Sequence, residues 1–229
     1  MLNIKYFYFN PYRERCMLIW DKGPDTVIID PGFLSDEEKD SFFSTIEEKE
    51  LKPVAVVLTH GHFDHIYGVK ACVDKFGIPV YMHPDERILI DNMDSFIGDS
   101  GYPVPDLDWS TVDMTDGQSL CLAGIRFDVI HTPGHSPGSV CLYCPQTKDL
   151  FSGDTLFAGT IGTTSHKYGD YDLEIVSIMD KLMGMDGDVR VHPGHGGGTT
   201  IAFERTNNPF LQPFNYKDEE GNVDGIITK

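Results

Sequence analysis

Short apolar runs, several of them alternating with polar residues, recur along the chain and predict β-strands. They are rich in β-branched and aromatic residues and are bounded by Gly, Pro, Asn or Asp, as strands typically are. The run from Val54 to Leu58 is apolar throughout, which predicts a strand buried on both faces. The predicted strands cover residues 4–9, 16–20, 26–29, 54–58, 80–83, 126–130, 139–143 and 189–191.

Apolar residues at helical spacing fill some of the gaps between these strands. Ser35, followed three residues later by Glu38, is a capping-type helix start, and Phe42, Phe43 and Ile46 continue with helical spacing. Further helices are predicted from an apolar stripe over residues 66–76 and from the patterns at 88–93 and 173–183. This order of elements favours an α/β domain in which helices pack outside two sheets.

We expect a single domain over residues 1–229, with residues 207–229 as a C-terminal tail. The tail could pack over the domain or join a subunit contact, and the oligomeric state is left open. Two stretches, 95–109 and 157–170, match no regular element and are rich in Gly, Pro, Asp, Ser or Thr. Irregular loops of this length in a compact domain are more often functional or disordered than idle.

Charge and composition narrow the possible partners. The chain has 36 acidic against 18 basic residues, a formal net charge of −18, so nucleic acid is not expected as a partner. No apolar run approaches the ~18 residues of a membrane helix, and the N-terminal residues do not have a signal-peptide pattern. We therefore expect a cytoplasmic protein without a membrane partner. Cys141 and Cys144 have Cys-x-x-Cys spacing, but on a strand they would face opposite sides, so reduced thiols are expected.

The densest set of reactive side chains follows the strand at 54–58. Directly after Thr59, the six residues from His60 to His65 include His60, His62, Asp64 and His65. The end of a strand that opens into a loop before a helix is where α/β folds bind ligands. Imidazole nitrogens and a carboxylate are the ligands that zinc, iron and manganese accept. Three imidazoles without a metal would repel one another when protonated, so the segment predicts a metal site.

Three more candidates occur in similar local settings. His135 follows the strand at 126–130 within Thr-Pro-Gly-His, Asp154 follows Leu150-Phe-Ser-Gly, and His195 follows the last strand within His-Pro-Gly-His. Glycine lets the backbone approach a site closely, and a Pro-Gly pair fixes where the next side chain points. Alone, each would be read as a surface or turn residue, and it is the His60–His65 segment that makes them candidate ligands. His83, His131 and His192 are read as structural, outer or surface residues.

These motifs resemble the metallo-β-lactamase-fold superfamily of metallohydrolases. The resemblance rests on the His60–His65 segment, the Thr-Pro-Gly-His135-Ser-Pro-Gly-Ser block, Ser-Gly-Asp154-Thr-Leu-Phe, Pro-Gly-His195-Gly and Ile28-Ile-Asp30-Pro-Gly. It runs from about residue 27 to 200 in the order of the family. The implied fold is a four-layer αβ/βα sandwich of two mixed sheets with helices outside.

The resemblance also implies a ligand set for two divalent metal ions, zinc first, with iron or manganese as alternatives. His60, His62 and His135 would hold the first ion, Asp64, His65 and His195 would hold the second, and Asp154 would bridge them. Asp64 and Asp154 would be the catalytic carboxylates. Asp30 would orient a ligand from behind, or would simply be a turn acid before Pro31.

Within the superfamily the chain looks most like the short glyoxalase II-like (hydroxyacylglutathione hydrolase-like) thioesterases. That similarity implies hydrolysis of a small-molecule thioester by a metal-bridged hydroxide. No cysteine lies near Asp154 or His195, against a typical zinc β-lactamase, and no tyrosine lies just past Asp154, against a lactonase. The alternatives are a persulfide dioxygenase with one iron, a lactonase, and a non-catalytic metal-binding protein on the same fold.

One departure from the family concerns the substrate. Persulfide dioxygenases and many short thioesterases carry a Gly-Arg-Thr-Asp run after the bridging acid, whereas this chain has Ile161-Gly-Thr-Thr-Ser165. Glutathione is an anion, and its binding would require basic residues near the site. His166 and Lys167 are the substitutes nearest in sequence, although either could be an exposed loop residue.

Overall fold

The computed structural model describes residues 2–98 and 100–212, and its strands form two large mixed sheets and one small sheet. The first sheet has the order β1 (Asn3–Tyr6), β2 (Met17–Trp20), β3 (Asp25–Ile29), β4 (Lys52–Val57), β5 (Val80–Met82) and β6 (Thr111–Asp113). It is antiparallel from β1 to β3 and parallel from β3 to β6.

The second sheet has the order β14 (Thr199–Thr200), β13 (Arg190–Pro193), β10 (Asp149–Gly153), β9 (Val140–Cys144), β8 (Ile125–His131) and β7 (Ser119–Leu122). Its strands pair antiparallel except for β10 with β13. A two-stranded ribbon of β11 (Leu156–Phe157) and β12 (Thr160–Ile161) follows β10.

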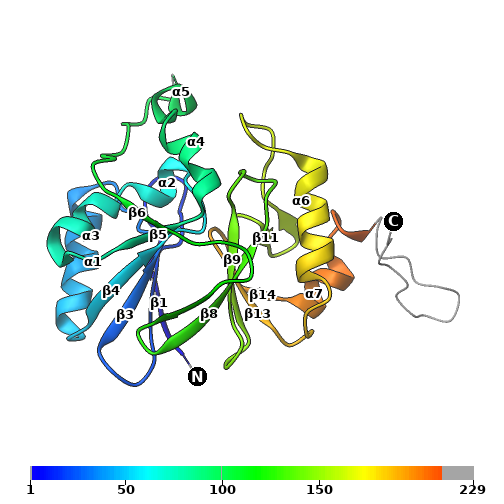
Figure 1. Ribbon diagram of the computed structural model, residues 1–229, viewed down its shortest axis with the longest axis horizontal. Coiled ribbons are helices and arrows are strands. Elements are labelled where there is room, and N and C mark those ends of the chain that lie inside the picture. The colour runs from blue at the N-terminus through cyan, green and yellow to red at the C-terminus, as the bar shows by residue number, and fades with distance from the viewer. Residues whose placement is uncertain (1, 99, 213–229) are drawn as a thin grey trace, which may run out of the picture.

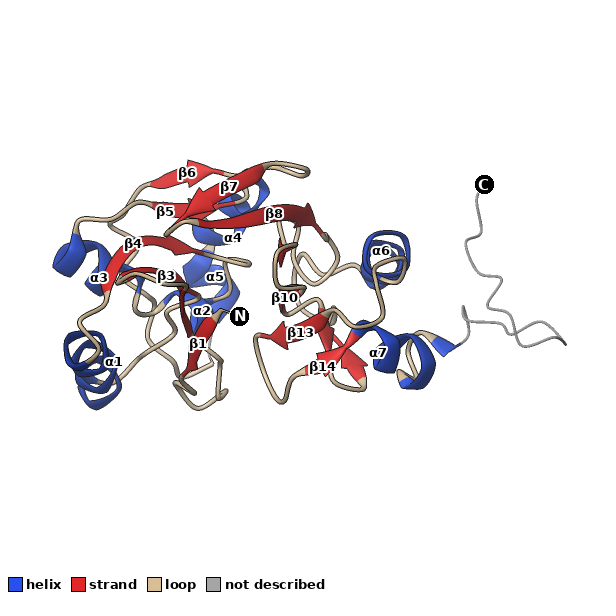
Figure 2. Cartoon of the chain, turned by 90° about the horizontal axis from the view of Figure 1, so that it is seen from below, coloured by secondary structure: helices blue, strands red, loops and turns tan. Residues whose placement is uncertain are grey.

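Helices cover the outer faces of both sheets. Helices α1 (Asp36–Glu48) and α3 (Val69–Phe76) lie beside the first sheet, and α6 (Tyr171–Ser177) and α7 (Ile201–Asn207) lie beside the second (Figures 1 and 2). Short helices α2 (Phe63–Ile66), α4 (Arg87–Ile90) and α5 (Met93–Ile97), with the 3₁₀ turn Pro84–Glu86, sit over one end of the sheets. The predicted four-layer αβ/βα sandwich is confirmed. Within the described residues no helix is long and apolar enough to cross a membrane.

Side chains alternate between two cores along the central strands. Met17 and Ile19 of β2 point between the sheets, while Leu18 packs under α1 and α3. In the second sheet, Leu142 of β9 faces the inter-sheet core and Cys141 faces the core under α6 and α7. This period-2 alternation produces three apolar layers and holds the two sheets face to face.

The paired cysteines follow the same alternation. Cys141 lies in the outer core and Cys144 in the inter-sheet core, and all five cysteines of the chain are free thiols. The expectation that Cys141 and Cys144 face opposite sides of their strand is therefore confirmed.

Element boundaries differ from the prediction in several places. The helix at Ser35 begins as expected, with a complete capping box between Ser35 and Glu38. The strand predicted over 4–9 is regular only to Tyr6, and the helix predicted over 88–93 divides into α4 and α5. The helix predicted over 173–183 begins earlier, capped by Asp170, and continues after Ser177 as a π-helical turn, Ile178–Leu182. The hydrophobic pattern did not predict β6, β12 or β14, which have only two or three residues each.

The start of the predicted tail packs on the domain. Helix α7 ends at Asn207, and both Asn208 and Leu211 are fully buried. The Asn208 side chain donates to the Thr160 carbonyl at 3.0 Å and to Glu204 at 2.8 Å. The rest of the predicted tail, residues 213–229, lies outside the described residues.

Candidate metal centre

Four loops, each following a strand, bring the candidate ligands to one end of the two sheets. The segment from His60 to His65 follows β4 of the first sheet. His135 lies between β8 and β9, Asp154 directly follows β10, and His195 follows β13, all in the second sheet. A hydrogen bond from the Val140 amide to the Thr59 carbonyl, 2.9 Å, joins the two sheets beside the cluster.

The first cluster contains His60, His62 and His135. One ring nitrogen of each lies within 4.8 Å of the others, and all three side chains are buried. Their Nε2 atoms are buried and have no hydrogen-bond partner in the part of the chain that the structure describes. A buried polar atom without a partner costs free energy. Three such nitrogens facing one point are the donor set that a transition metal takes.

The electrostatics of this cluster favour neutral imidazoles. Burial lowers the pKa of His60 and of His62 well below the usual value, and the neighbouring imidazoles lower both further. Burial also lowers the pKa of His135, to about 4. A neutral imidazole keeps the lone pair that a metal requires, so the protonation states fit a ligand role.

The second cluster contains Asp64, His65 and His195, again with ligand atoms within 4.8 Å of one another. His195 Nε2 lies 3.3 Å from Asp64 Oδ2 and 3.2 Å from His65 Nε2. Burial opposes the charged form of both histidines, but Asp154 and Asp64 raise the pKa of each above its usual value. These carboxylates give the second cluster a more negative setting than the first.

Asp154 lies between the two clusters. Its carboxylate oxygens are 3.4 Å from His65 Nε2, 3.5 Å from His195 Nε2 and 3.6 Å from His135 Nε2. Burial would raise the pKa of Asp154, but His65 and His195 outweigh burial and hold it well below the usual range. A side chain at Gly194 would collide with Asp154 and His65, which explains a glycine before His195.

Contacts behind the ligands fix which ring nitrogen faces the site. Asp30 accepts hydrogen bonds from the Thr59 amide (2.7 Å) and hydroxyl (2.6 Å), and lies 3.1 Å from Nδ1 of His65. His135 Nδ1 lies 2.7 Å from the Thr163 carbonyl, and His195 Nδ1 lies 3.1 Å from the Tyr12 carbonyl. Each contact leaves the Nε2 of its histidine toward the cluster.

Three buried glutamates near the site were not singled out from the sequence. Glu86 accepts hydrogen bonds of 2.6 Å from the Gly61 amide, the Ser136 hydroxyl and the Gly138 amide, and so ties the first cluster's two loops together. Glu174 accepts from the His135 amide at 2.7 Å, and burial raises its pKa to about 8.

Glu14 is the third of these glutamates. It is fully buried, with Oε1 4.0 Å from His65 Nδ1, and burial raises its pKa well above the usual value. The only sequence signal for such residues is a single acid among apolar neighbours, as in Leu173-Glu174-Ile175.

Both irregular stretches border the site. A cavity of about 550 Å³ opens over the clusters, and its walls come from the loop between β1 and β2, from α2 and α5, and from the stretch after β11. The ring of Phe96 stacks on His62 at 4.8 Å between centroids. His166 is not a free surface residue, because its ring contacts those of His62 (4.6 Å) and His135 (5.0 Å). The lining residues are Tyr12, His62, Phe63, Asp64, Phe96, Ile97, Ser100, His135, Asp154, Phe157, Thr160, Ile161, Thr163, His166 and His195.

The remaining histidines lie outside the two clusters. His83 and His131 stack on each other with ring centroids 4.0 Å apart. His192 lies between the Asp149 carboxylate (2.7 Å) and the Tyr6 hydroxyl (2.8 Å).

Comparison with known proteins gives the class. Residues 10–195 match the family model described as the Metallo-beta-lactamase superfamily. The chain is 34% identical over 216 residues to hydroxyacylglutathione hydrolase GloC of Haemophilus influenzae. The alignment covers 92% of this chain and 98% of that protein. The fold and these matches define a metallo-hydrolase. The chain belongs to the metallo-beta-lactamase superfamily.

Two solved structures are similar over most of their length. BLEG-1, described as a B3 metallo-beta-lactamase, is 37% identical with a TM-score of 0.84, covering 91% of this chain and 99% of that one. TTHA1623, solved in a di-iron-bound form, is 35% identical with a TM-score of 0.80, covering 90% of this chain and 100% of that one.

Proposed function

We propose that this protein hydrolyses hydroxyacyl thioesters at a centre of two divalent metal ions. His60, His62 and His135 would hold one ion, Asp64, His65 and His195 the other, and Asp154 would bridge them. The observation that carries the proposal is the position of Asp154, with its carboxylate 3.4 to 3.6 Å from histidines of both clusters. Every position of the implied ligand set is filled, which a non-catalytic binding protein would not require.

Two bound divalent ions would supply a water of lowered pKa and would polarise a carbonyl oxygen. The residues around them would position the substrate and exclude water. Phe63, Phe96 and Phe157 line the cavity and suit an acyl chain. Asp64 also lines this cavity, and its carboxylate would take up a proton during turnover.

A thioester fits a site of this composition. A thiolate is a good leaving group and requires little proton donation. The chain shares 34% identity with a protein named as a hydroxyacylglutathione hydrolase, which supports the same substrate class. Zinc is our first expectation for the metal, and iron is a direct alternative because the similar TTHA1623 is described as di-iron-bound.

A second candidate is β-lactam hydrolysis. A structure 37% identical to this chain is described as a B3 metallo-beta-lactamase, which supports a β-lactam as the second substrate class to test. A mononuclear persulfide dioxygenase and a lactonase are disfavoured by the sequence after Asp154, which has neither the arginine of the first nor the tyrosine of the second.

The experiment combines metal analysis with a substrate panel. The purified protein should bind about two metal ions per chain and should release thiol from S-D-lactoylglutathione. The same preparation is assayed with a chromogenic β-lactam, with a lactone, and with glutathione persulfide while oxygen uptake is measured. These assays test the alternative functions. One iron per chain with oxygen uptake would replace this proposal with the dioxygenase. β-Lactam turnover without thioester turnover would replace it with the lactamase.

A further inference from the structure

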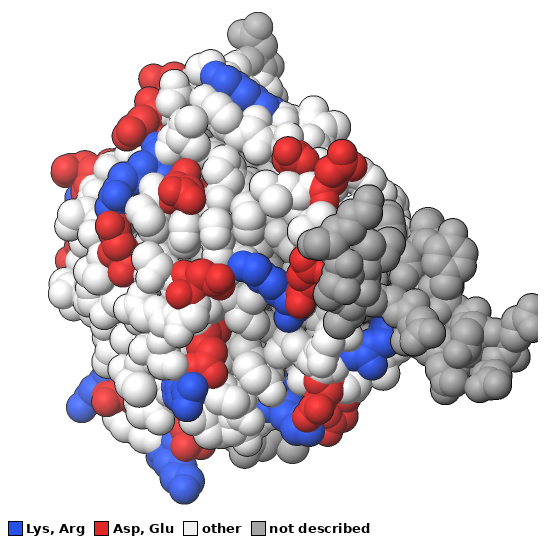
Figure 3. Space-filling model, turned by 45° about the vertical axis from the view of Figure 1, so that its right-hand side comes forward, with Lys and Arg blue, Asp and Glu red and all other residues white. Residues whose placement is uncertain are grey.

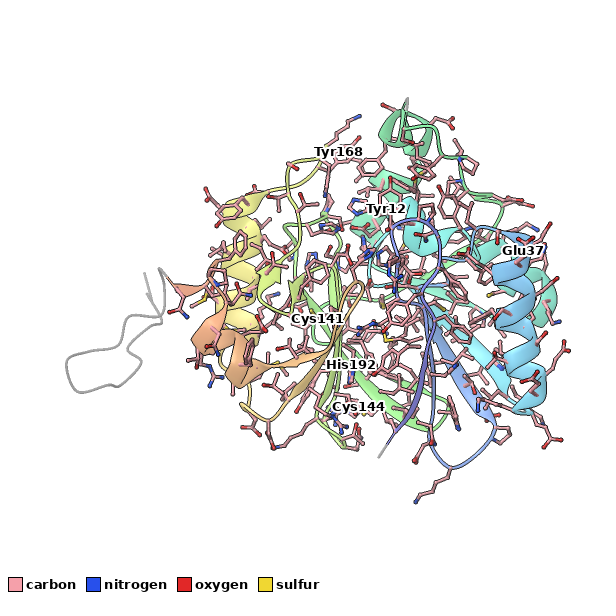
Figure 4. The ribbon with its side chains drawn as sticks, turned by 180° about the vertical axis from the view of Figure 1, so that it is seen from behind. Tyr12, Glu37, Cys141, Cys144, Tyr168 and His192 are labelled. Carbon is pink, nitrogen blue, oxygen red and sulfur yellow. The ribbon has the colours of Figure 1, made fainter. Side chains whose placement is uncertain are left out.

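Three hollows share walls in succession and lead away from the candidate metal centre. Tyr12 and His195 line the cavity over the clusters, and Tyr12 also lines a second hollow of about 500 Å³. That second hollow shares Tyr8 and Gly197 with a third of about 740 Å³. Figure 4 shows Tyr12, on the loop between β1 and β2, and His192, on β13, on this face of the molecule. We call the second and third hollows together the trough.

The trough carries two arginines from the loop between β1 and β2. Arg13 lines the second hollow and Arg15 lines the third. No ion pair of either with a carboxylate occurs within residues 2–98 and 100–212, whereas Arg87, Arg126 and Arg190 each pair with an aspartate. On the face in Figure 3, by contrast, lysines and arginines lie among aspartates and glutamates. Two guanidinium groups without a carboxylate partner in one trough are unusual for a chain of net charge −18.

Arg15 is built into the wall rather than extended into solvent. It is 3% exposed, and its guanidinium lies over the rings of Tyr6 (5.0 Å) and Tyr8 (5.6 Å). One terminal nitrogen donates to the Gly196 carbonyl, and the Arg15 amide donates to the Gly194 carbonyl at 2.7 Å. Its Nε is buried without a hydrogen-bond partner among the described residues. Arg15 thus contacts the residues on both sides of His195, so the positive charge of the trough begins next to the second cluster.

The third hollow is lined by both polar and apolar side chains. Arg190 lies there with its charge balanced by Asp149, beside Thr199 and Thr200. Phe203 is 52% exposed at the same wall, and Tyr8 is 50% exposed. A molecule lying along the trough would meet both guanidinium groups and exposed aromatic rings.

We infer that the trough binds the thiol part of the substrate, and that this part carries anionic groups which Arg13 and Arg15 recognise. The inference rests on the proposed thioesterase function. A guanidinium fork binds carboxylate or phosphate in two parallel hydrogen bonds, so either a carboxylate-bearing peptide thiol or a phosphate-bearing thiol has the required chemistry. The trough therefore supplies the basic residues that are missing from the stretch after Asp154.

The test uses one acyl group on three thiols. S-Lactoylglutathione carries carboxylates, lactoyl-coenzyme A carries phosphates, and S-lactoyl-N-acetylcysteamine is neutral. Arg13→Gln should raise KM for the preferred anionic thioester about tenfold, the change for one lost charged contact. It should leave kcat, and all constants for the neutral thioester, unchanged. Raising the ionic strength should increase KM for the anionic substrate less in the variant than in the wild type.

Arg126→Gln is the matched control. Arg126 is an exposed arginine on β8 that pairs with Asp128. Its substitution should change neither KM nor kcat for any of the three thioesters. Arg15→Gln is a second variant, with metal content and thermal stability measured beside kinetics because Arg15 is buried. An equal loss on neutral and anionic thioesters in Arg13→Gln, or no loss on either, would overturn the inference.

Binding of unreactive thioethers separates the two proposals. S-Methylglutathione and S-methyl-coenzyme A cannot be hydrolysed, and calorimetry should find one of them bound to the wild type and weakened about tenfold by Arg13→Gln. If the wild type hydrolyses none of the thioesters, the proposed function fails. Thioether binding that depends on Arg13 would still support the anion site in that case, and binding that ignores Arg13 would reject it.

Discussion

The Asp30 carboxylate lies 3.1 Å from Nδ1 of His65, on the side of the ring away from Asp154. The same carboxylate accepts two hydrogen bonds from Thr59, so its position is fixed from the first sheet. His65 therefore presents Nε2 to the cluster. The contact at Nδ1 fixes both the orientation of the ring and the nitrogen that carries the proton.

Replacing Asp30 by Asn should weaken metal binding at the second cluster. The amide cannot accept from both Thr59 and His65 as the carboxylate does, and loss of such an outer contact reduces metal affinity or activity about 10- to 100-fold. Asn also tolerates the positive φ of 48° at this position. Competition with a chelator, followed by elemental analysis and kcat, measures the effect.

Glu14→Gln is the comparison for that variant. Glu14 also lies behind His65, but burial raises its pKa well above the usual value, so a neutral amide resembles its protonated form. Metal affinity should fall less than in Asp30→Asn. Equal losses in the two variants would mean that Asp30 has no particular orienting role.

Asp154→Ala should abolish turnover and lower the metal content. Its carboxylate is the only one that lies within 3.6 Å of histidines from both clusters among the described residues. Asp154→Asn, which keeps the shape and loses the charge, should retain more metal than Asp154→Ala. Asp188→Ala, at an exposed carboxylate that pairs with Lys148, is the control. Full activity in Asp154→Ala would be incompatible with a bridging carboxylate.

Glu86→Gln should destabilise the loops of the first cluster. Glu86 receives three hydrogen bonds from the Gly61 amide, the Ser136 hydroxyl and the Gly138 amide, and a Gln side chain would direct an N–H₂ group at one of these donors. An unsatisfied buried group costs about 1–3 kcal/mol of unfolding free energy. Chemical denaturation measures this, with Asp85→Asn at the exposed neighbour as control. Unchanged stability in Glu86→Gln would show that these bonds are replaceable.

Asp149 should contribute an acid-sensitive part of the stability. Burial would raise its pKa, but hydrogen bonds from His192 and Arg190 outweigh burial and lower it to about 2 from the usual 3.8. A depressed carboxyl pKa stabilises the fold above the unfolded value and is lost as pH falls through the folded value, here between about pH 4 and 2. The contribution is of the order of 2 kcal/mol. The difference in unfolding free energy between wild type and Asp149→Asn should be constant above pH ~4 and should shrink below it. A constant difference across that window would contradict it.

The candidate ligands are recognisable in the sequence because the chemistry is local. His60, His62 and His65 fall within a few residues of one another after an apolar strand. A bound metal would remove the repulsion that three protonated imidazoles would otherwise cause. His135 and His195 are convincing only as part of the ordered motif set, since each alone resembles a turn residue. Glu86 and Glu174 could not be found this way, because their partners are far away in sequence and exist only in the folded chain.

The fold was predictable to the same degree and for the same reason. Strands such as β2, β3 and β4 have an apolar pattern set by burial on both faces, whereas β6 and β14 exist only because a neighbouring strand pairs with them. The trough required the structure, since it forms where the loop carrying Arg15 meets the loop after β13.

The two sheets divide the candidate ligands between them. The first sheet supplies His60, His62, Asp64 and His65, and the second supplies His135, Asp154 and His195. Neither sheet alone carries all the candidate ligands of either proposed ion, so full coordination of an ion would require the two sheets to be packed together. Metal binding would then follow the packing of the two sheets, and a bound ion would stabilise that packing because it links residues from both sheets.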